Sequence, residues 1–238
     1  MKYCSILFFS LLFIMGCKKQ TESLVLDDIK ELYPLQVGKV FIYRMDSSRK
    51  VDFIFTTAYY LLKDSVVNSF LDNQGRTSYT IFRYITDTLA RQPYQYIETN
   101  YITFDKDKIE YVDGSNRRFI KLVNPVSLNT SWKGNRYFDT DSVLSIIIPG
   151  TTYYTNWDYQ YISVNQPYTV LKGNFASTYT IQQVADSNTA IPSKSYSTEV
   201  YAKGVGLIYK EMLFYFYQSP TNSGDGSFGL KLNLIDYR

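Results

Sequence analysis

Apolar and polar residues alternate along most of the chain, and this alternation predicts β-strands. Tyr, Phe, Ile, Val and Thr dominate the alternating stretches, and these residue types suit a pleated, half-buried surface. Successive strands at this spacing favour a mainly β fold, with a single curled or barrel-like antiparallel sheet. We expect strands within residues 40–45, 51–62, 66–85, 101–123, 158–164, 177–184, 197–202, 207–217 and 228–237.

Polar turn signals divide the longer alternating stretches. A turn at residues 72–75 makes 66–85 a hairpin, and turns at 105–108 and 113–116 make 101–123 a three-stranded meander. Residues 124–157 alternate least and hold both tryptophans, so we interpret them as a long connection. The polar residues 219–227 are expected to join the last two strands. We assign residues 24–238 to one β-rich domain.

One short helix is expected before the first strand. Ser23 is placed to cap it, Asp27 and Asp28 favour its early turns, and Pro34 ends it. No second helix of any length is predicted.

The first sixteen residues have the layout of a signal peptide. Lys2 supplies a positive charge. The ten residues that begin at Ile6 are apolar except for Ser10, and this apolar run is too short to span a bilayer. The next residues, Ile14-Met15-Gly16-Cys17, resemble the lipobox of bacterial lipoproteins.

That resemblance implies cleavage before Cys17 and attachment of lipid to its thiol and its new amino group. Two or more acyl chains give a stable membrane anchor. Residues 17–23 would then be the lipidated cysteine and a solvated tether. A buried N-terminal helix or strand, with an incidental cysteine, is the structural alternative.

Composition excludes several kinds of chemistry. The chain has no histidine and two cysteines, of which Cys4 would leave with the signal peptide and Cys17 would carry lipid. Neither Ser-His-Asp nor Cys-His catalysis can then be built, and no metal site or cofactor is expected. The formal net charge of +3 is too small and too scattered for nucleic-acid binding.

Two further stretches resemble lipoproteins of the Bacteroidota to which no activity is assigned. Residues 34–43, PLQVGKVFIY, are similar to the P-L-x-x-G-x-x-W-x-Y opening of that group, with Phe41 in place of the tryptophan. Residues 201–211 are similar to its late G-V-G-L strand. This resemblance implies an outer-membrane lipoprotein, and Lys18 and Lys19 after the lipidated cysteine favour the periplasm-facing side.

The same resemblance implies O-glycosylation at Asp-Ser/Thr-apolar tripeptides. Such tripeptides begin at Asp64, Asp87 and Asp141. Ordinary turns at strand edges are the alternative interpretation of these three sites.

Aromatic residues provide the main candidate for a binding site. If residues 157–161 are a strand, Trp157, Tyr159 and Tyr161 share one face and form a platform on which sugar rings would stack. The alternative is a tyrosine-rich sheet whose rings pack together with their hydroxyls toward water.

Two acidic clusters are also candidates. Asp105, Asp107 and Asp113 have part of the spacing of a calcium loop, but Ile109 occupies a ligand position, and charged hairpin turns are the favoured interpretation. Asp139 and Asp141 would face the same way on a strand, as paired carboxylates of a glycosidase do.

These observations favour a non-enzymatic lipoprotein with a binding or structural role in the envelope, without measurable turnover on generic hydrolase substrates. Two alternatives stay open: a carbohydrate- or lipid-binding module, and a carboxylate-based hydrolase. An exposed aromatic row would favour carbohydrate, a closed apolar interior would favour lipid, and two facing acids in a deep cleft would favour the hydrolase.

The lipobox makes the first testable prediction. Cys17→Ala removes the thiol that would receive lipid, so we expect the variant to leave the membrane fraction or to stay unprocessed. Metabolic labelling with a radioactive fatty acid measures this directly. Labelling of the variant equal to that of the wild type would show that Cys17 is not the attachment point.

Overall fold

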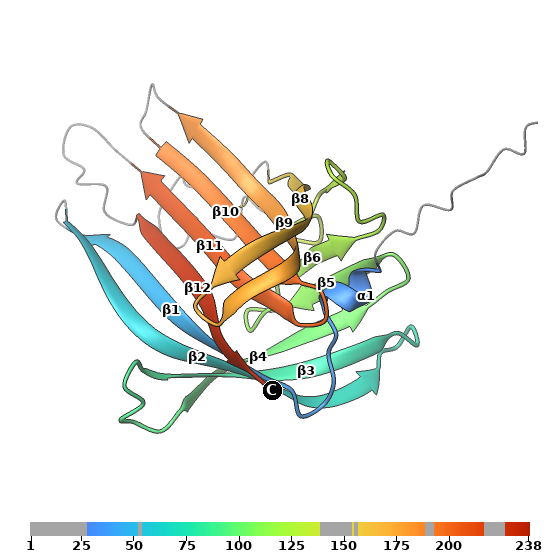
Figure 1. Ribbon diagram of the computed structural model, residues 1–238, viewed down its shortest axis with the longest axis horizontal. Coiled ribbons are helices and arrows are strands. Elements are labelled where there is room, and N and C mark those ends of the chain that lie inside the picture. Colours follow the sequence, from blue (N-terminus) through green and yellow to red (C-terminus); the bar gives the residue numbers. More distant parts are fainter. Residues whose placement is uncertain (1–27, 52–53, 139–153, 155–156, 189–192, 217–226) are drawn as a thin grey trace, which may run out of the picture.

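Twelve β-strands form one sheet in which every pair of neighbours is antiparallel (Figure 1). The computed structural model describes residues 28–51, 54–138, 154, 157–188, 193–216 and 227–238. The strands are β1 (Val40–Val51), β2 (Ile54–Leu71), β3 (Thr77–Asp87), β4 (Gln95–Phe104), β5 (Lys108–Val112), β6 (Arg118–Val123), β7 (Ser131–Trp132), β8 (Tyr159–Val170), β9 (Gly173–Asn188), β10 (Ser193–Ala202), β11 (Gly206–Phe216) and β12 (Phe228–Tyr237).

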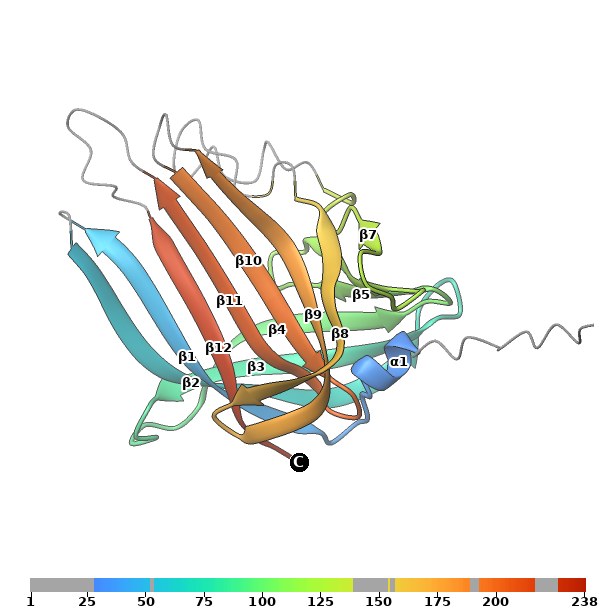
Figure 2. The same cartoon turned by 45° about the horizontal axis from the view of Figure 1, so that its top comes forward.

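The sheet curls until its two edge strands nearly meet. Its order is β6-β5-β4-β3-β2-β1-β12-β11-β10-β9-β8-β7. Across the remaining seam, the Ile120 amide donates to the Gly134 carbonyl at 2.8 Å, and the Trp132 indole N–H donates to the Ile120 carbonyl at 2.8 Å. Figure 2 shows β9 to β12, β1 and β2 as one curved wall, with β3 and β4 crossing behind it. The predicted barrel-like antiparallel sheet is therefore confirmed.

Helix α1 (Ile29–Leu32) covers one end of this barrel-like sheet. Its two apolar residues, Ile29 and Leu32, are completely buried, and the helix contacts both β5 and β11. The helix is shorter than the sequence predicts, and its N-cap is Asp28, whose carboxylate accepts from the Lys30 amide at 3.0 Å. Ser23, the predicted cap, lies outside the described residues.

The predicted turns are confirmed. Amide-to-carbonyl bonds of 2.8–2.9 Å close each of them, at residues 72–75, 105–108 and 113–116. In the connection of residues 124–157, β7 is the one strand that the described residues contain. No helix in the described part of the chain is long and apolar enough to cross a bilayer.

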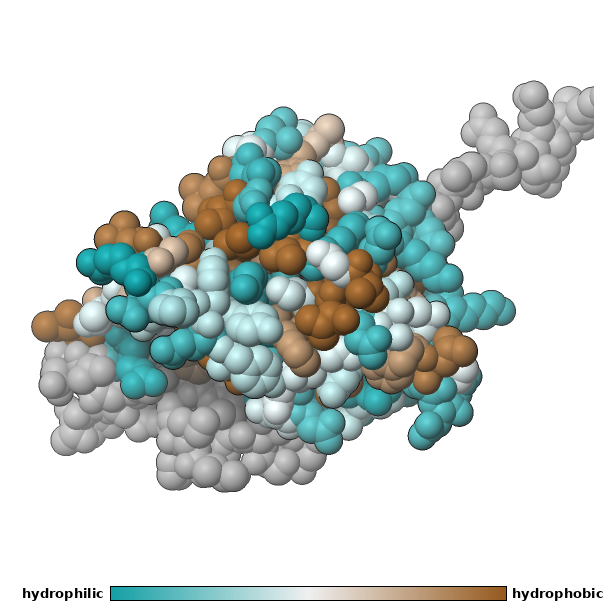
Figure 3. All heavy atoms as spheres, turned by 90° about the horizontal axis from the view of Figure 1, so that it is seen from below, coloured by the Kyte–Doolittle hydropathy of each residue, from teal (hydrophilic) through white to brown (hydrophobic). Residues whose placement is uncertain are grey.

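The two faces of the sheet differ in the residues that they carry. The inner face carries most of the apolar core, including Leu62, Ile81, Ile102, Ile208 and Leu234. On the molecular face seen in Figure 3, hydrophobic side chains gather in several patches that polar residues separate. No single apolar patch covers that view, and the inner face itself is interrupted by charged residues, which are described below.

Two glycines control the turn between β10 and β11. Gly204 has φ +78° and Gly206 has φ +119°, and both values lie where side-chain-bearing residues are rare. The Gly204 amide donates to the Glu31 carbonyl of α1 at 2.8 Å, so this backbone conformation also holds the helix against the sheet.

We therefore expect Gly204→Val and Gly206→Val each to lower the free energy of unfolding by roughly 1–3 kcal/mol, through backbone strain. No atom lies within 4 Å of a Cβ built at Gly204, so crowding is not the cause there. Thermal or urea unfolding measures the loss. Gly204→Asn is the matched control, because asparagine tolerates positive φ, and it should lose much less. Equal losses for Val and Asn at position 204 would contradict the explanation by strain.

Candidate functional site

The three aromatic residues of the predicted platform lie inside the protein. The exposed fractions of Trp157, Tyr159 and Tyr161 are 4%, 1% and 0%. A sugar ring needs an open aromatic face for stacking, so this geometry does not offer a platform at these residues.

The same rings fill the seam where the sheet nearly closes. Trp132 lies 5.0 Å from Tyr161 and 5.8 Å from Tyr159, measured between ring centroids. The Tyr159 hydroxyl donates to Asn135 Oδ1 at 2.9 Å, and the Tyr161 hydroxyl donates to the Val123 carbonyl at 2.9 Å. The hydroxyls thus bind protein groups rather than pointing to water, which corrects the alternative interpretation as well.

The remaining sequence candidates do not assemble into a site. Asp105 and Asp113 belong to two separate hairpin turns, where each carboxylate accepts a backbone amide of its own turn and pairs with an arginine. Among the described residues, no group of three or more acidic, cysteine or histidine side chains is arranged to hold a metal ion. Cys17, Asp139 and Asp141 lie outside the described residues.

The glycosylation tripeptides fall in different surroundings. Asp64 and Val66 are buried on either side of Ser65 in the middle of β2, whereas Thr88 and Leu89 are exposed in the turn after β3. The third tripeptide, residues 141–143, lies outside the described residues. Modification at any of them stays a prediction.

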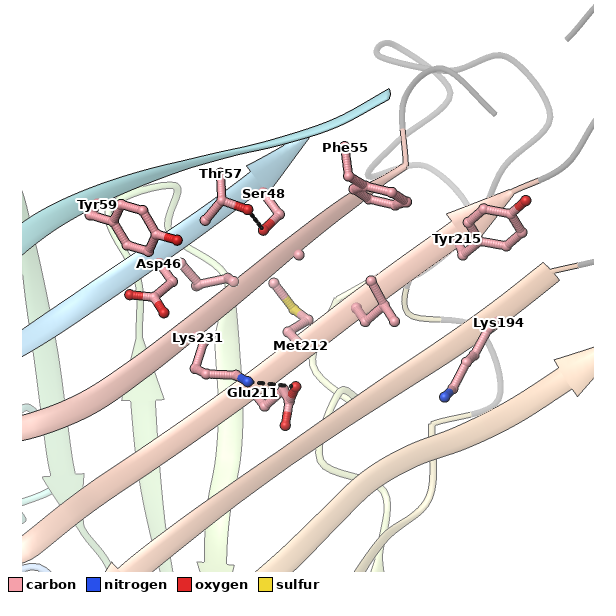
Figure 4. Close-up of a pocket in the computed structure, with 13 residues that line it drawn as sticks. Asp46, Ser48, Phe55, Thr57, Tyr59, Lys194, Glu211, Met212, Tyr215 and Lys231 are labelled. Atoms are coloured by element: carbon pink, nitrogen blue, oxygen red, sulfur yellow. Dashed lines mark hydrogen bonds and ion pairs between the residues drawn. The ribbon is translucent and has the colours of Figure 1, made fainter. Parts of the chain in front are cut away.

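A groove with a volume of about 530 Å³ lies on the outer face of the sheet (Figure 4). We call it the outer groove. Its floor is made of small residues, because Ser48 of β1 is paired with Gly229 of β12. Gly229 has no side chain, and this leaves the space open between the larger residues on neighbouring strands.

Aromatic side chains stand at one end of the outer groove. Phe55 from β2 and Tyr215 from β11 lean toward each other across the two strands between them, with ring centroids 6.5 Å apart and an interplanar angle of 29°. The Lys50 ammonium lies 4.8 Å from the Tyr215 ring centre and 5.8 Å from that of Phe55. Phe55 is 44% exposed, so part of its ring is open to a ligand.

Charged and hydroxyl groups line the rest of the outer groove. The register places Lys231 opposite Asp46 on one side and Glu211 on the other. Lys231 Nζ lies 3.3 Å from Glu211 Oε1, as Figure 4 shows. Asp46 is held by a two-point contact from Arg44, at 2.8 Å for both bonds. The wall therefore offers both donors and acceptors, and neither sign of charge dominates it.

A second polar region lies inside the curled sheet, where the lysines of two strands meet one glutamate. Lys121 Nζ of β6 lies 2.6 Å from Glu199 Oε1 of β10, and Lys210 Nζ of β11 lies 3.1 Å from the same oxygen. The Tyr201 hydroxyl donates to Glu199 Oε2 at 2.8 Å. The Glu199 side chain is 1% exposed. This lysine–glutamate–lysine group carries one surplus positive charge.

Burial and charge together set the ionisation of this group. Burial alone would raise the pKa of Glu199, but the Lys121 and Lys210 ammonium groups and the Tyr201 hydroxyl lower it to about 2. Burial lowers the pKa of Lys121 to about 8, although Glu199 acts in the opposite direction. At neutral pH the carboxylate and the Lys121 ammonium therefore face each other as ions.

A complementary group lies beside it, with one arginine between two acids. Arg83 of β3 donates through Nε and Nη2 to the two carboxylate oxygens of Asp64, at 2.7 and 2.8 Å. Its Nη1 donates to Glu98 Oε1 at 2.9 Å. This group carries one surplus negative charge, which balances the surplus of the lysine–glutamate–lysine group.

These groups surround a cavity in two parts, which we call the inner cavity. One part has a volume of about 70 Å³ and is lined by Asp64, Asn100 and Glu199 among others. The other has about 190 Å³ and is lined by Glu98 and Gln183 among others. Four residues line both parts, namely Arg83, Tyr111, Lys121 and Lys210. The interior is thus polar where an apolar lipid chain would need it to be apolar.

Neither the outer groove nor the polar interior was predicted from the sequence, although the sequence contains a signal for each. Arg83 and Lys121 occupy the inward phase of strands whose other inward residues are apolar or aromatic, and Glu199 lies between Ser197 and Tyr201 on the inward face of β10. Gly229 interrupts a strand pattern, which signals a bulge or a close approach. What the sequence does not supply is the register that brings residues of distant strands together.

Comparisons with known proteins find only distant similarity to solved structures. No family model matches the chain, and no curated protein matches it. One similar solved structure is described as a predicted exported protein with a YmcC-like fold from Bacteroides fragilis, with 10% identity and a TM-score of 0.38. The match covers 85% of this chain and 96% of that one. Another is described as a predicted lipoprotein from Parabacteroides distasonis, with 13% identity, a TM-score of 0.38, and coverage of 87% and 98%.

The interior ion pair makes a testable prediction about stability. Glu199→Gln leaves the buried Lys121 ammonium and the half-buried Lys210 ammonium without their carboxylate, so we expect a loss of about 3–5 kcal/mol in the free energy of unfolding. Asp236→Asn is the control, because it breaks the exposed pair between Lys172 and Asp236 and should change little. Similar small losses for both variants in urea unfolding would show that the buried pair is not structural.

The same variant has an expected pH dependence. The folded-state pKa of Glu199 lies below its ordinary value of 4.5, so its contribution to stability is complete above pH 4.5. It is lost as the pH falls from 4.5 toward 2. The difference in stability between the wild type and Glu199→Gln should therefore shrink over that window. A difference that stays constant from pH 6 to pH 3 would contradict the assignment.

Proposed function

We propose that this protein is a membrane-anchored, non-enzymatic binding protein whose outer groove takes a neutral saccharide. Lipid on Cys17 would hold it at the outer membrane, facing the periplasm, as the lipobox implies. The observation that carries the proposal is the outer groove itself, where partly exposed aromatic rings stand over a small-residue floor beside a mixed polar wall.

The chemistry of a sugar fits this arrangement. A sugar ring has an apolar face of C–H groups, which packs on an aromatic ring, and an edge of hydroxyls that donate and accept hydrogen bonds. Phe55 and Tyr215 supply the rings, and Asp46, Glu211 and Lys231 supply acceptors and a donor. The volume of about 530 Å³ lies in the usual range for small-molecule sites.

The mixed charge of the wall supports a neutral ligand. Acidic and basic side chains alternate across the sheet, so a strongly anionic or cationic ligand would meet repulsion as well as attraction. This proposal keeps the carbohydrate-binding alternative from the sequence but moves it from Trp157, Tyr159 and Tyr161 to the outer groove.

The ionisation of the interior supports a binding role over hydrolysis. A carboxylate hydrolase needs one carboxyl whose raised pKa lets it act as a general acid. The pKa of Glu199 is lowered instead, and Arg83 holds Asp64 and Glu98 as ion pairs. Glu199 is therefore not suited to donate a proton near neutral pH.

The proposal predicts binding that depends on the groove floor. A glycan array probed with the full-length, detergent-extracted chain should identify a neutral oligosaccharide, and calorimetry then gives its Kd. Gly229→Val should weaken that binding at least tenfold, because its side chain occupies the floor. A Cβ at Gly229 meets its nearest neighbour at 3.5 Å, an ordinary contact, so the variant should fold normally.

Aromatic variants provide the second arm of this experiment. Phe55→Ala should weaken binding by a similar factor. Tyr101→Ala is the control and should not weaken it, because Tyr101 is an aromatic residue of similar exposure, 40%, that does not line the outer groove. Absence of any glycan ligand, or equal affinities of the wild type and Gly229→Val, would refute the proposed function.

A further inference from the structure

The larger part of the inner cavity contains a buried donor that has no partner. Gln183 of β9 is 2% exposed, and its Nε2 donates no hydrogen bond within the described part of the chain. Its Oε1 accepts from the Ser197 hydroxyl at 2.7 Å, which holds the amide with its nitrogen free. An unsatisfied buried donor costs about 1–3 kcal/mol, so Gln183 calls for an acceptor that is not protein. Asn100, whose Oδ1 is also unpartnered, lines the smaller part instead.

The register of three strands places this donor beside two ammonium groups. Ser197 and Glu199 are two residues apart on β10, so their side chains share the inward face at a distance of about 7 Å. Gln183 bonds to Ser197, and Lys210 of β11 is paired with Glu199. Lys121 binds the same Glu199 oxygen as Lys210. The amide and the two ammonium groups are therefore neighbours, and all three residues line the larger part of the inner cavity.

The spare hydrogen-bonding capacity at this point consists of donors. An ammonium group has three hydrogens, and Lys121 and Lys210 each direct one to Glu199 Oε1. Neither ammonium group has another ion-pair partner among the described residues. Gln183 Nε2 adds its own free N–H groups. A group that only accepts hydrogen bonds matches this set, and an ionised carboxylate is such a group.

The charges that line the larger part favour an anion. Four cationic side chains line it, against the two carboxylates of Glu98 and Asp113. Each of these carboxylates is already paired with an arginine, Glu98 with Arg83 and Asp113 with Arg117. Glu199, which the two lysines share, lines the smaller part. The surplus of the lysine–glutamate–lysine group is a single positive charge, so a monovalent anion matches it better than a divalent one.

Size and access are compatible with a small carboxylate. The larger part of the inner cavity, about 190 Å³, equals the liquid volume of roughly six water molecules, so an anion of about four to six non-hydrogen atoms fits. The two oxygens of a carboxylate are about 2 Å apart and each bond is about 2.8 Å long, so the group can bridge donors about 7 Å apart. The side chains of Glu98, Arg117 and Lys210, which line this part, are 29%, 29% and 22% exposed, so the cavity reaches solvent between them.

We propose that the larger part of the inner cavity is a binding site for a small monocarboxylate, whose oxygens accept from Gln183 Nε2 and from the ammonium groups of Lys121 and Lys210. None of these three residues lines the outer groove, so the site does not depend on the proposed saccharide binding.

The test is calorimetry on the full-length, detergent-extracted chain at neutral pH and constant ionic strength, with acetate as the probe. Acetamide is the matched control, because it has nearly the same shape but no charge. We expect acetate to bind with a Kd below about 1 mM and at least tenfold more tightly than acetamide. Absence of binding with acetate up to about 10 mM would mean that the cavity holds only water and would overturn the proposal, as would equal affinities for the two probes.

A pair of matched variants locates the site. Gln183→Glu keeps the acceptor for Ser197 but puts a negative oxygen where the free donor lies, so the affinity for acetate should fall at least tenfold. Gln166→Glu makes the same change at an exposed glutamine of β8 that does not line the inner cavity, and it should leave the affinity unchanged. Equal affinities of these two variants for acetate would overturn the proposal. If Gln183→Glu fails to fold, Lys210→Met removes one of the two ammonium groups and carries the same expected loss.

Discussion

The contact between Lys121 and Glu199 is the interaction on which the arrangement of the molecule depends. The two residues are separated by 78 positions in the sequence, and they join β6, an edge strand, to β10 in the opposite wall. An antiparallel sheet has no intrinsic reason to bring these strands together. The ion pair, with Lys210 and Tyr201 around it, gives the inner face a specific point at which the two walls meet.

Burying charges in this way costs free energy unless every charge is matched by an opposite one. On the inner face, the two groups together carry equal numbers of positive and negative charges. Two ammonium groups share one carboxylate, and one guanidinium shares two, so each group alone is unbalanced while the two together are neutral. Aromatic packing at the seam and α1 at one end keep most water away from this region.

On the outer face, the shape of the candidate site depends on a missing side chain. Gly229 removes one side chain from the middle of a twelve-stranded sheet, and the neighbouring rows supply aromatic and charged walls. One sheet thus carries two candidate sites with little chemistry in common. The effect of a substitution on one face can therefore be measured separately from the other face.

How much of this could be predicted from the sequence depends on whether a feature is local. The alternation predicted the strands, and Asp72 and Asp113 predicted turns, because each of these signals acts over a few residues. The predicted start of the helix was wrong, because Asp28 rather than Ser23 caps α1. Trp157, Tyr159 and Tyr161 were expected to form an open platform but are buried, since burial depends on which strands close the seam. The meeting of Lys121 with Glu199 requires the register of the seven strands between them in the sheet, and no local pattern contains it.

The most direct measurement of this account is a crystal structure of the ligand-free protein at a resolution that shows ordered water. The central claim is that the Lys121–Glu199 contact joins the two walls of the sheet. The account predicts Lys121 Nζ and Lys210 Nζ both bonded to Glu199 Oε1, with the Tyr201 hydroxyl on Glu199 Oε2. A Glu199 carboxylate turned away from Lys121, with water between the two walls, would contradict it.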